Sequence, residues 1–184
     1  NVIMQTRHNV SARVQFLVQA AMIAALYTVL TLVAAMLNWA YGPVQFRFSE
    51  AMTVLPMFTP AAIPGLAVGC FLSNVWSNMG VMDMIFGTLA TLLAAVATRA
   101  ARHVRVKGIP VLAPLPPVVC NALIVGLEIT LVSPGGFLWP AFLANALSVG
   151  AGELVVCYVL GLPLAILLDR LDAENKLFSG GSLR

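Results

Sequence analysis

The residues best suited to chemistry are acidic side chains placed within apolar sequence. Glu128 and Glu153 each lie inside a long hydrophobic run, and Glu50 and Asp83 stand at the ends of such runs. A carboxylate near the centre of a bilayer costs ~2.5–3.5 kcal/mol on insertion scales, so it usually faces the bundle interior and serves a function. The alternative for Glu128 and Glu153 is an interhelical hydrogen bond that only fixes packing. For Asp83 the alternative is a helix cap.

Two asparagines accompany these carboxylates on the expected helices. Asn121 and Glu128 share a face, because seven residues make nearly two helical turns, and Asn121 would lie ~10 Å deeper. Asn145 lies near the outer end of the last apolar run, with Glu153 deeper. The sequence therefore predicts a substrate-binding pocket in the outer half of the bundle. Its residues would be Glu50, Asn121, Glu128, Asn145 and Glu153.

Arg47 differs from the other basic residues because it lies between hydrophobic segments, apart from the basic ends and the basic loop. Ser49 can cap a helix that starts there, and Pro56 ends that run early. A short, proline-interrupted membrane segment with a charge at its mouth indicates a binding site in a transporter. The alternative is an interfacial Arg47–Glu50 pair that only anchors a loop. The secondary candidates for ligand contact are Arg47, Trp76, Asn78 and Asp83.

The predicted pocket is rich in acceptors and poor in positive charge, which favours a ligand that has many donors or carries a cation. A carboxylate accepts two hydrogen bonds side by side, as the N–H/NH₂ edge of a guanine-like base would offer. Tryptophans near the same side, Trp39, Trp76 and Trp139, could stack on a planar ligand, although interfacial tryptophans are common. We find no catalytic, metal-binding or nucleotide-binding motif, so no catalysis, metal or cofactor is expected.

Composition places the chain in a membrane. Of its 184 residues, 60% are hydrophobic and 9% are charged, and its mean hydropathy is +0.95. A soluble domain is usually about 25% charged. We expect one integral membrane domain over residues 1–172 and a polar tail over 173–184. The tail's Ser179-Gly-Gly-Ser182 resembles a flexible linker such as cloning leaves behind.

Hydropathy predicts an all-α bundle of six helices. Their expected ranges are Val14–Leu37, Ser49–Phe58, Leu66–Trp76, Asp83–Thr98, Val111–Leu131 and Ala141–Leu168. Six crossings put both termini on one side, together with the basic Arg99–Lys107 loop. The opposite side carries only Arg47. The positive-inside rule therefore predicts cytoplasmic termini in a multi-pass protein of the cell membrane, and it explains the basic pI without a nucleic-acid partner.

The first expected helix carries pairs of alanines four residues apart. Ala20 with Ala24, and Ala21 with Ala25, make small-xxx-small patterns that allow close helix approach in lipid. Spacing alone leaves open whether these alanines face a partner protein or another helix of this chain.

Several strings in the sequence resemble the QueT family. They are Tyr41-Gly-Pro-Val-Gln-Phe-Arg-Phe-Ser-Glu50, Val54–Pro60, Ala61–Gly65, Ala113–Pro117 and Asn121-Ala-Leu-Ile-Val-Gly-Leu-Glu128. The family comprises substrate-binding S components of energy-coupling factor (ECF) transporters. The resemblance implies capture of a queuosine precursor, a 7-deazaguanine such as queuine, preQ1 or preQ0, at the outer face. It also implies a transmembrane coupling subunit and two cytoplasmic ATPases as partners. In this superfamily an alanine-rich face of the first helix meets the coupling subunit, which favours Ala20, Ala21, Ala24 and Ala25 as that interface.

Two other functions compete with this reading. A self-sufficient, proton-coupled secondary transporter would use a buried carboxylate such as Glu153 as a proton site. An intramembrane enzyme that acts on a lipid would need a catalytic set, which the sequence lacks.

Overall fold

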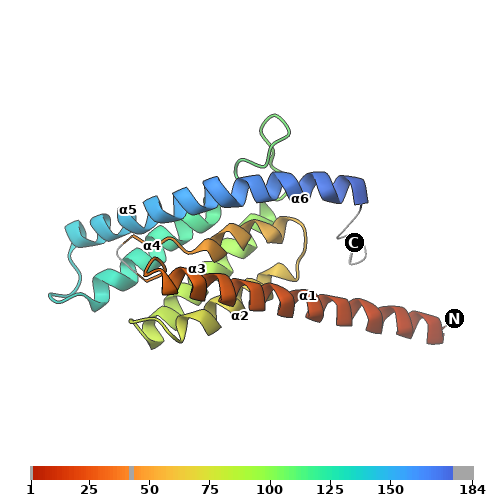
Figure 1. Ribbon diagram of the computed structural model, residues 1–184, viewed down its shortest axis with the longest axis horizontal. Coiled ribbons are helices and arrows are strands. Elements are labelled where there is room, and N and C mark those ends of the chain that lie inside the picture. Colours follow the sequence, from red (N-terminus) through yellow and green to blue (C-terminus); the bar gives the residue numbers. More distant parts are fainter. Residues whose placement is uncertain (1, 42–43, 176–184) are drawn as a thin grey trace.

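The computed structural model describes residues 2–41 and 44–175, and side chains within 11–41 and 44–171. Its elements are α1 (Val2–Met36), the 3₁₀ helix η1 (Phe48–Met57), α2 (Ala62–Asn74), α3 (Val81–Ala100), α4 (Leu115–Val132), α5 (Trp139–Val156), the π-helical turn η2 (Cys157–Gly161) and α6 (Leu162–Asn175). They form one elongated bundle (Figure 1). In the described part the only β pairing is an isolated bridge between Val106 and Ile109.

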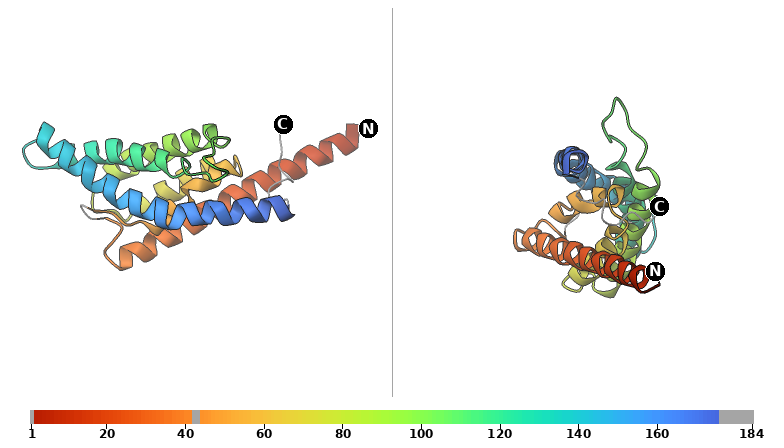
Figure 2. Two further views of the ribbon diagram at one scale, coloured as in Figure 1. Left: turned by 90° about the horizontal axis from the view of Figure 1, so that it is seen from above. Right: turned by 90° about the vertical axis from the view of Figure 1, so that its right-hand side faces the viewer.

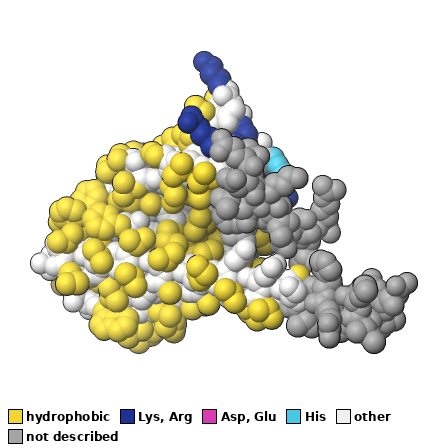
Figure 3. Space-filling model, turned by 45° about the vertical axis from the view of Figure 1, so that its right-hand side comes forward, with side chains coloured by type: hydrophobic (Ala, Val, Ile, Leu, Met, Phe, Trp, Pro, Cys, Tyr) yellow, Lys and Arg dark blue, Asp and Glu magenta, His cyan; other side chains and the backbone are white. Residues whose placement is uncertain are grey.

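Four segments of the described chain are long and apolar enough to cross a membrane, namely Ser11–Met36, Val81–Ala100, Leu115–Val132 and Trp139–Leu171. Apolar side chains cover much of the face shown in Figure 3, and lysine and arginine side chains gather beside one end of it. The predicted all-helical, multi-pass membrane protein is therefore confirmed.

The second expected helix differs most from the prediction. It is a 3₁₀ helix that contains Pro56, and it begins at Phe48 with Arg47 at its N-cap. Ser49 is thus not the N-cap, and its hydroxyl lies 2.6 Å from that of Thr31 instead. A 3₁₀ helix rises ~2.0 Å per residue against 1.5 Å for an α-helix, so this short segment reaches further through the bundle. It contacts α1, α2, α3, α5, η2 and α6, and so lies at the centre of the bundle.

The last expected helix is longer than predicted and is not uniform. It runs from Trp139 to Asn175 with the π-helical turn η2 inside it. Together α5, η2 and α6 correspond to the predicted sixth helix, so the six α-helices do not match the six predicted ones in order. α6 includes the start of the predicted polar tail, whose residues 176–184 lie outside the described ones.

The two ends of the bundle differ in charge. The start of α1, the end of α6 and the basic loop between α3 and α4 lie at one end (Figures 1 and 2). We call the opposite end, where η1 and α3 begin, the distal end. In the basic loop Arg105 donates two hydrogen bonds, of 2.6 and 2.7 Å, to Asp169 on α6. This exposed pair joins the loop to the last helix.

Glycines on α2 allow α1 to approach closely. A Cβ atom on Gly65 would lie 2.8 Å from the Ala20 carbonyl oxygen, and one on Gly69 would lie 2.9 Å from that of Ala24. This is the close approach that small residues permit in lipid. Ala20 and Ala24 therefore pack inside this chain, whereas Ala21 and Ala25 are exposed. Only the second alanine pair is free to meet a partner.

Candidate functional site

A buried ion pair organises the distal end. Arg47, just before η1, lies 3.4 Å from Asp83 at the start of α3, and both side chains are buried. The Arg47 guanidinium also donates to the Ala40 carbonyl at 3.0 Å and to the Asn74 side-chain oxygen at 3.3 Å. Asn74 in turn donates to the Asp83 backbone carbonyl at 2.9 Å. The connection after α1 is thereby fastened to the ends of α2 and α3.

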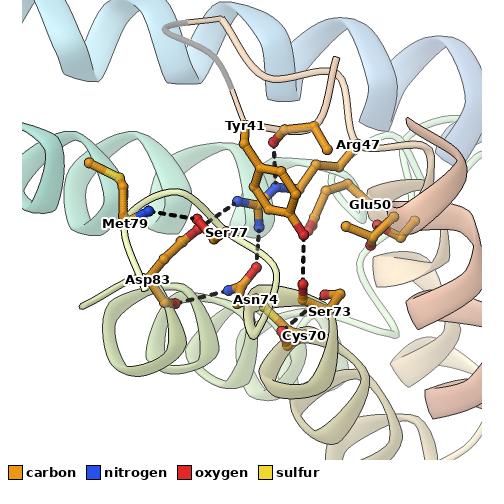
Figure 4. Close-up of polar contacts among 12 residues, drawn as sticks. Tyr41, Arg47, Glu50, Cys70, Ser73, Asn74, Ser77, Met79 and Asp83 are labelled. Atoms are coloured by element: carbon orange, nitrogen blue, oxygen red, sulfur yellow. Dashed lines mark hydrogen bonds and ion pairs between the residues drawn. The ribbon is translucent and has the colours of Figure 1, made fainter. Parts of the chain in front are cut away.

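Tyr41 completes this attachment. Its hydroxyl donates to the Ser73 carbonyl at 2.6 Å, and its ring centroid lies 5.2 Å from Arg47 Cζ. Figure 4 shows Arg47 held among Tyr41, Asn74 and Asp83. The connection also rests on α5, because a Cβ atom on Gly152 would overlap the Gln45 carbonyl oxygen.

A cavity of about 250 Å³ lies beside this network. Side chains from the connection after α1, from the α2–α3 turn, from the start of α3, from the end of α4 and from the first half of α5 line it. They are Tyr41, Gln45, Ser77, Asn78, Met79, Asp83, Ile129 and Asn145. Ligand pockets usually measure about 300–1,000 Å³, so this cavity suits a compact ligand. It combines an aromatic ring, amides and one carboxylate.

Glu128 is a buried acid of α4 that does not line this cavity. It directly precedes the lining residue Ile129, and it interacts electrostatically with Asp83 and Arg47. The side chain is fully buried, and neither of its oxygens has a hydrogen-bond partner. The second oxygen of Asp83, Oδ1, also lacks a partner. The distal end thus contains three buried carboxylate oxygens that make no hydrogen bond.

A second polar group, which we call the middle layer, lies deeper in the bundle. Glu50 accepts a hydrogen bond from the Tyr27 hydroxyl, while its other oxygen has no partner. Cys157 on η2 lies 3.6 Å from Glu153 Oε2 and 3.8 Å from the Glu50 carbonyl. Asn121 is within range of both carboxyl groups, but its Nδ2 meets no acceptor at hydrogen-bonding geometry. The middle layer therefore also contains buried polar atoms that make no hydrogen bond.

The distal cavity is not the largest in the structure. A groove of about 560 Å³ lies between the connection after α1 and the segment formed by α5 and η2. It is lined by Trp39, Phe46, Phe48, Val155, Val159 and neighbouring residues. It is almost wholly apolar and offers little to orient a polar ligand. No group of three or more His, Cys, Asp or Glu side chains among the described residues could hold a metal ion.

The comparisons with known proteins assign the chain to a transporter family. Residues 17–170 match the family described as QueT transporter. The chain belongs to the QueT transporter family. It is also 39% identical over 77 residues to a protein of Lactococcus lactis subsp. cremoris (strain MG1363) named "Queuosine precursor transporter QueT". That alignment covers 42% of this chain and 45% of the relative, so it spans less than half of either. No solved structure matches the chain significantly.

In this QueT-family chain the predicted pocket residues divide into two groups. Glu50, Asn121 and Glu153 come together in the middle layer, as described above. Glu128 lies at the distal end, and Asn145 lines the cavity there while donating to Thr130 at 3.0 Å. The sequence analysis predicted a single pocket for these five residues. Helical spacing gives the depth of a residue along its own helix, but not its distance from residues on other helices.

The secondary candidates also divide. Asn78 and Asp83 line the distal cavity, and Arg47 does not line it but donates a hydrogen bond to Asp83. Asp83 is bound to Arg47 and makes no cap hydrogen bond, and Arg47 does not pair with Glu50, so both sequence alternatives are wrong. Trp76 is 62% exposed and does not line the cavity.

Several residues of this candidate site were not singled out from the sequence, and two of them are tyrosines. Tyr41 lines the cavity, and Tyr27 fixes one oxygen of Glu50. Tyr41 stands six residues before Arg47. The short distance in sequence between an aromatic residue and this isolated cation was the signal that could have identified Tyr41. Tyr27 lies in an unbroken apolar run, where its burial against Glu50 leaves no local signature.

Proposed function

We propose that this chain is the membrane-embedded substrate-capture subunit (S component) of an ECF-type importer, and that it binds a queuosine precursor, a 7-deazaguanine base, at the distal cavity. The observation that carries the proposal is the cavity itself. It sets the ring of Tyr41 and the amides of Asn78 and Asn145 beside the Asp83 carboxylate, whose Oδ1 is unused. A planar base with N–H donors uses each of these groups.

The size of the cavity favours a base over its nucleoside. About 250 Å³ is small for a ligand pocket,, and a ribose would add a second ring with several hydroxyl groups. The buried carboxylates disfavour phosphate, since a second anion would meet repulsion where charges are poorly screened. The name of the Lactococcus relative points to the same class of compound.

The orientation of the chain in the membrane is inferred from charge. The basic loop, the start of α1 and the end of α6 lie toward the same end of the bundle, which the positive-inside rule assigns to the cytoplasm. The distal cavity would then open toward the outside of the cell membrane, where a capture subunit meets its ligand. ATP hydrolysis would come from two cytoplasmic ATPases through a transmembrane coupling subunit, and the exposed alanines Ala21 and Ala25 offer that subunit a smooth contact.

Binding and uptake test the proposal separately. Calorimetry on the purified chain should show binding of 7-deazaguanines and of guanine but not of adenine, which lacks the N1–H and 2-amino donors. A site built for those donors rejects an analogue without them strongly. In proteoliposomes, uptake should require the coupling subunit, both ATPases and ATP. If no guanine-type base binds, the proposal is wrong.

The middle layer favours a second candidate, a proton-coupled secondary transporter. Glu153 is a buried carboxyl group beside Glu50, and intramembrane carboxyl groups often relay protons,. This candidate requires uptake by the chain alone under a proton gradient, abolished by Glu153→Gln. If that uptake appears without ATP or partner subunits, the secondary transporter replaces the S component.

A further inference from the structure

The basic loop between α3 and α4 contains a small β-hairpin with a tight turn at its tip. Val106 and Ile109 pair across it, and the backbone N–H of each donates to the carbonyl of the other at 3.0 Å. The two residues between them, Lys107 and Gly108, have φ angles of 52° and 82°. Positive φ at both central residues is typical of the type I′ turn, which joins two strands without splaying them. We call residues 104–109 the loop hairpin.

The loop hairpin has two faces of different character. Arg105 donates two hydrogen bonds to Asp169, so its side chain points toward α6. Successive side chains of a strand point to opposite faces, so Val106 lies on the face away from α6. Ile109 shares that face with Val106, because paired residues of a ladder project to the same side. These two residues and Val104 are 50%, 42% and 46% exposed, respectively, so the described part of the chain leaves an apolar face open.

The loop hairpin projects sideways from the bundle. It leaves the bundle at the end of α3 and extends away from the helices, across their direction (Figures 1 and 2). α3 has 20 residues, which is the length of one membrane crossing. The loop hairpin therefore begins at the level where the hydrocarbon of a bilayer ends, and it extends along the membrane surface.

The charge of this loop suits an anionic surface. The stretch 84–127 contains no acidic residue. Asp169 neutralises Arg105, so Lys107 at the exposed tip and Arg102 before the hairpin supply net positive charge. The cytoplasmic leaflet carries anionic lipids that attract such juxtamembrane residues. Basic side chains beside an exposed apolar face are typical of segments that bind at the membrane interface.

We propose that the loop hairpin is a membrane anchor. Its apolar face lies in the interfacial layer of the cytoplasmic leaflet, and Lys107 and Arg102 bind the phosphates of anionic lipids. The Arg105–Asp169 pair keeps the opposite face against α6. The anchor thereby holds the junction of α3 and α4 at the membrane surface. This inference uses the membrane orientation of the proposed function, but it does not depend on the ligand.

A tryptophan placed on the apolar face reports its surroundings. When Trp39, Trp76 and Trp139 are replaced by phenylalanine, Val106→Trp supplies the single tryptophan of the chain. The purified chain is reconstituted without partner proteins in vesicles of phosphatidylcholine and phosphatidylglycerol. Brominated lipids should then quench the tryptophan, its emission should shift to shorter wavelength than in water, and acrylamide should quench it weakly. Circular dichroism and thermal unfolding report whether the variant is folded.

Lys107→Gln in the same background tests the contribution of lipid charge. One basic residue near an anionic leaflet changes membrane binding roughly 5-fold. The ratio of lipid-bound to water-exposed hairpin, measured from quenching by brominated lipid, should fall by about that factor. Arg170→Gln is the matched control, because it removes the same charge from an exposed residue of α6. It should leave the ratio unchanged.

The outcomes separate a lipid from a protein partner. Quenching by acrylamide but not by brominated lipid overturns the anchor. Equal lipid quenching with and without phosphatidylglycerol overturns the binding of anionic lipids. Protection that appears only after the coupling subunit and the ATPases are added assigns the face to a protein and also overturns the anchor. If Val106→Trp does not fold, Val104→Trp gives the same measurement. Calorimetry with 7-deazaguanines is independent of these results, so failure of the anchor leaves the proposed function intact.

Discussion

Gly152 on α5 and Gln45 in the connection after α1 pack so closely that any Cβ atom at residue 152 would overlap the Gln45 carbonyl oxygen. The same connection carries Tyr41 and Gln45 to the cavity and Arg47 to its ion pair. A backbone contact on α5 thus helps to set the position of the residues that cover the cavity.

Gly152→Ala should therefore weaken ligand binding. The methyl group must displace the backbone near Gln45, and overpacking of this kind costs typically 1–3 kcal/mol, or roughly 5- to 150-fold if all of it appears in affinity. Calorimetry measures this change. Gly161→Ala is the control, because its nearest neighbour would be the Ala51 carbonyl oxygen at an ordinary 3.4 Å. Unchanged affinity in Gly152→Ala would mean that the connection does not shape the site.

The segment 39–50 should become more ordered when ligand binds. Its anchors are the Arg47 interactions with Asp83 and Asn74 and the Tyr41 hydrogen bond to Ser73, and a ligand in the cavity would add contacts to Tyr41 and Gln45. Closing segments commonly exclude water in this way. Hydrogen exchange over residues 39–50 should slow on ligand addition. The same rate in a demonstrably occupied protein would show that this segment does not close over the ligand.

Tyr41 should contribute to binding through its ring more than through its hydroxyl. Stacking of a base on an aromatic side chain is worth ~1–3 kcal/mol, so Tyr41→Ala should weaken binding roughly 5- to 150-fold. Tyr41→Phe keeps the ring and loses only the hydrogen bond to the Ser73 carbonyl, which costs ~0.5–1.5 kcal/mol. Dissociation constants of the two variants distinguish the roles. An equal loss in the two variants would assign Tyr41 a purely anchoring role.

The two alanine pairs of α1 should behave differently when enlarged. Ala21→Trp or Ala25→Trp adds bulk to an exposed face, so it should abolish assembly with the coupling subunit and ATP-driven uptake, yet leave ligand affinity nearly unchanged. Ala24→Trp adds bulk against Gly69 and should lower thermal stability and binding together. Co-purification, uptake and calorimetry are the measurements. Normal uptake by Ala21→Trp would show that this face is not the coupling surface.

The sequence by itself determined the class of the protein and much of the composition of its site. Hydropathy and the scarcity of charge fixed a multi-pass helical membrane protein, because apolar segments of these lengths have few other stable environments. The cost of burying carboxylates identified Glu50, Glu128 and Glu153 as interior residues, and all three are buried. Such inferences depend on local composition, which the sequence contains in full.

Only the tertiary structure decided how these residues are grouped. Helical spacing gives a residue's depth and face, but not which faces of different helices meet, since that depends on packing between distant segments. Arg47 therefore pairs with Asp83 rather than with its neighbour Glu50, and Tyr27 meets Glu50 across 23 residues of sequence. The close contact of Gly65 and Gly69 with α1 likewise decided which alanines face inward, because small residues permit approach without specifying the partner.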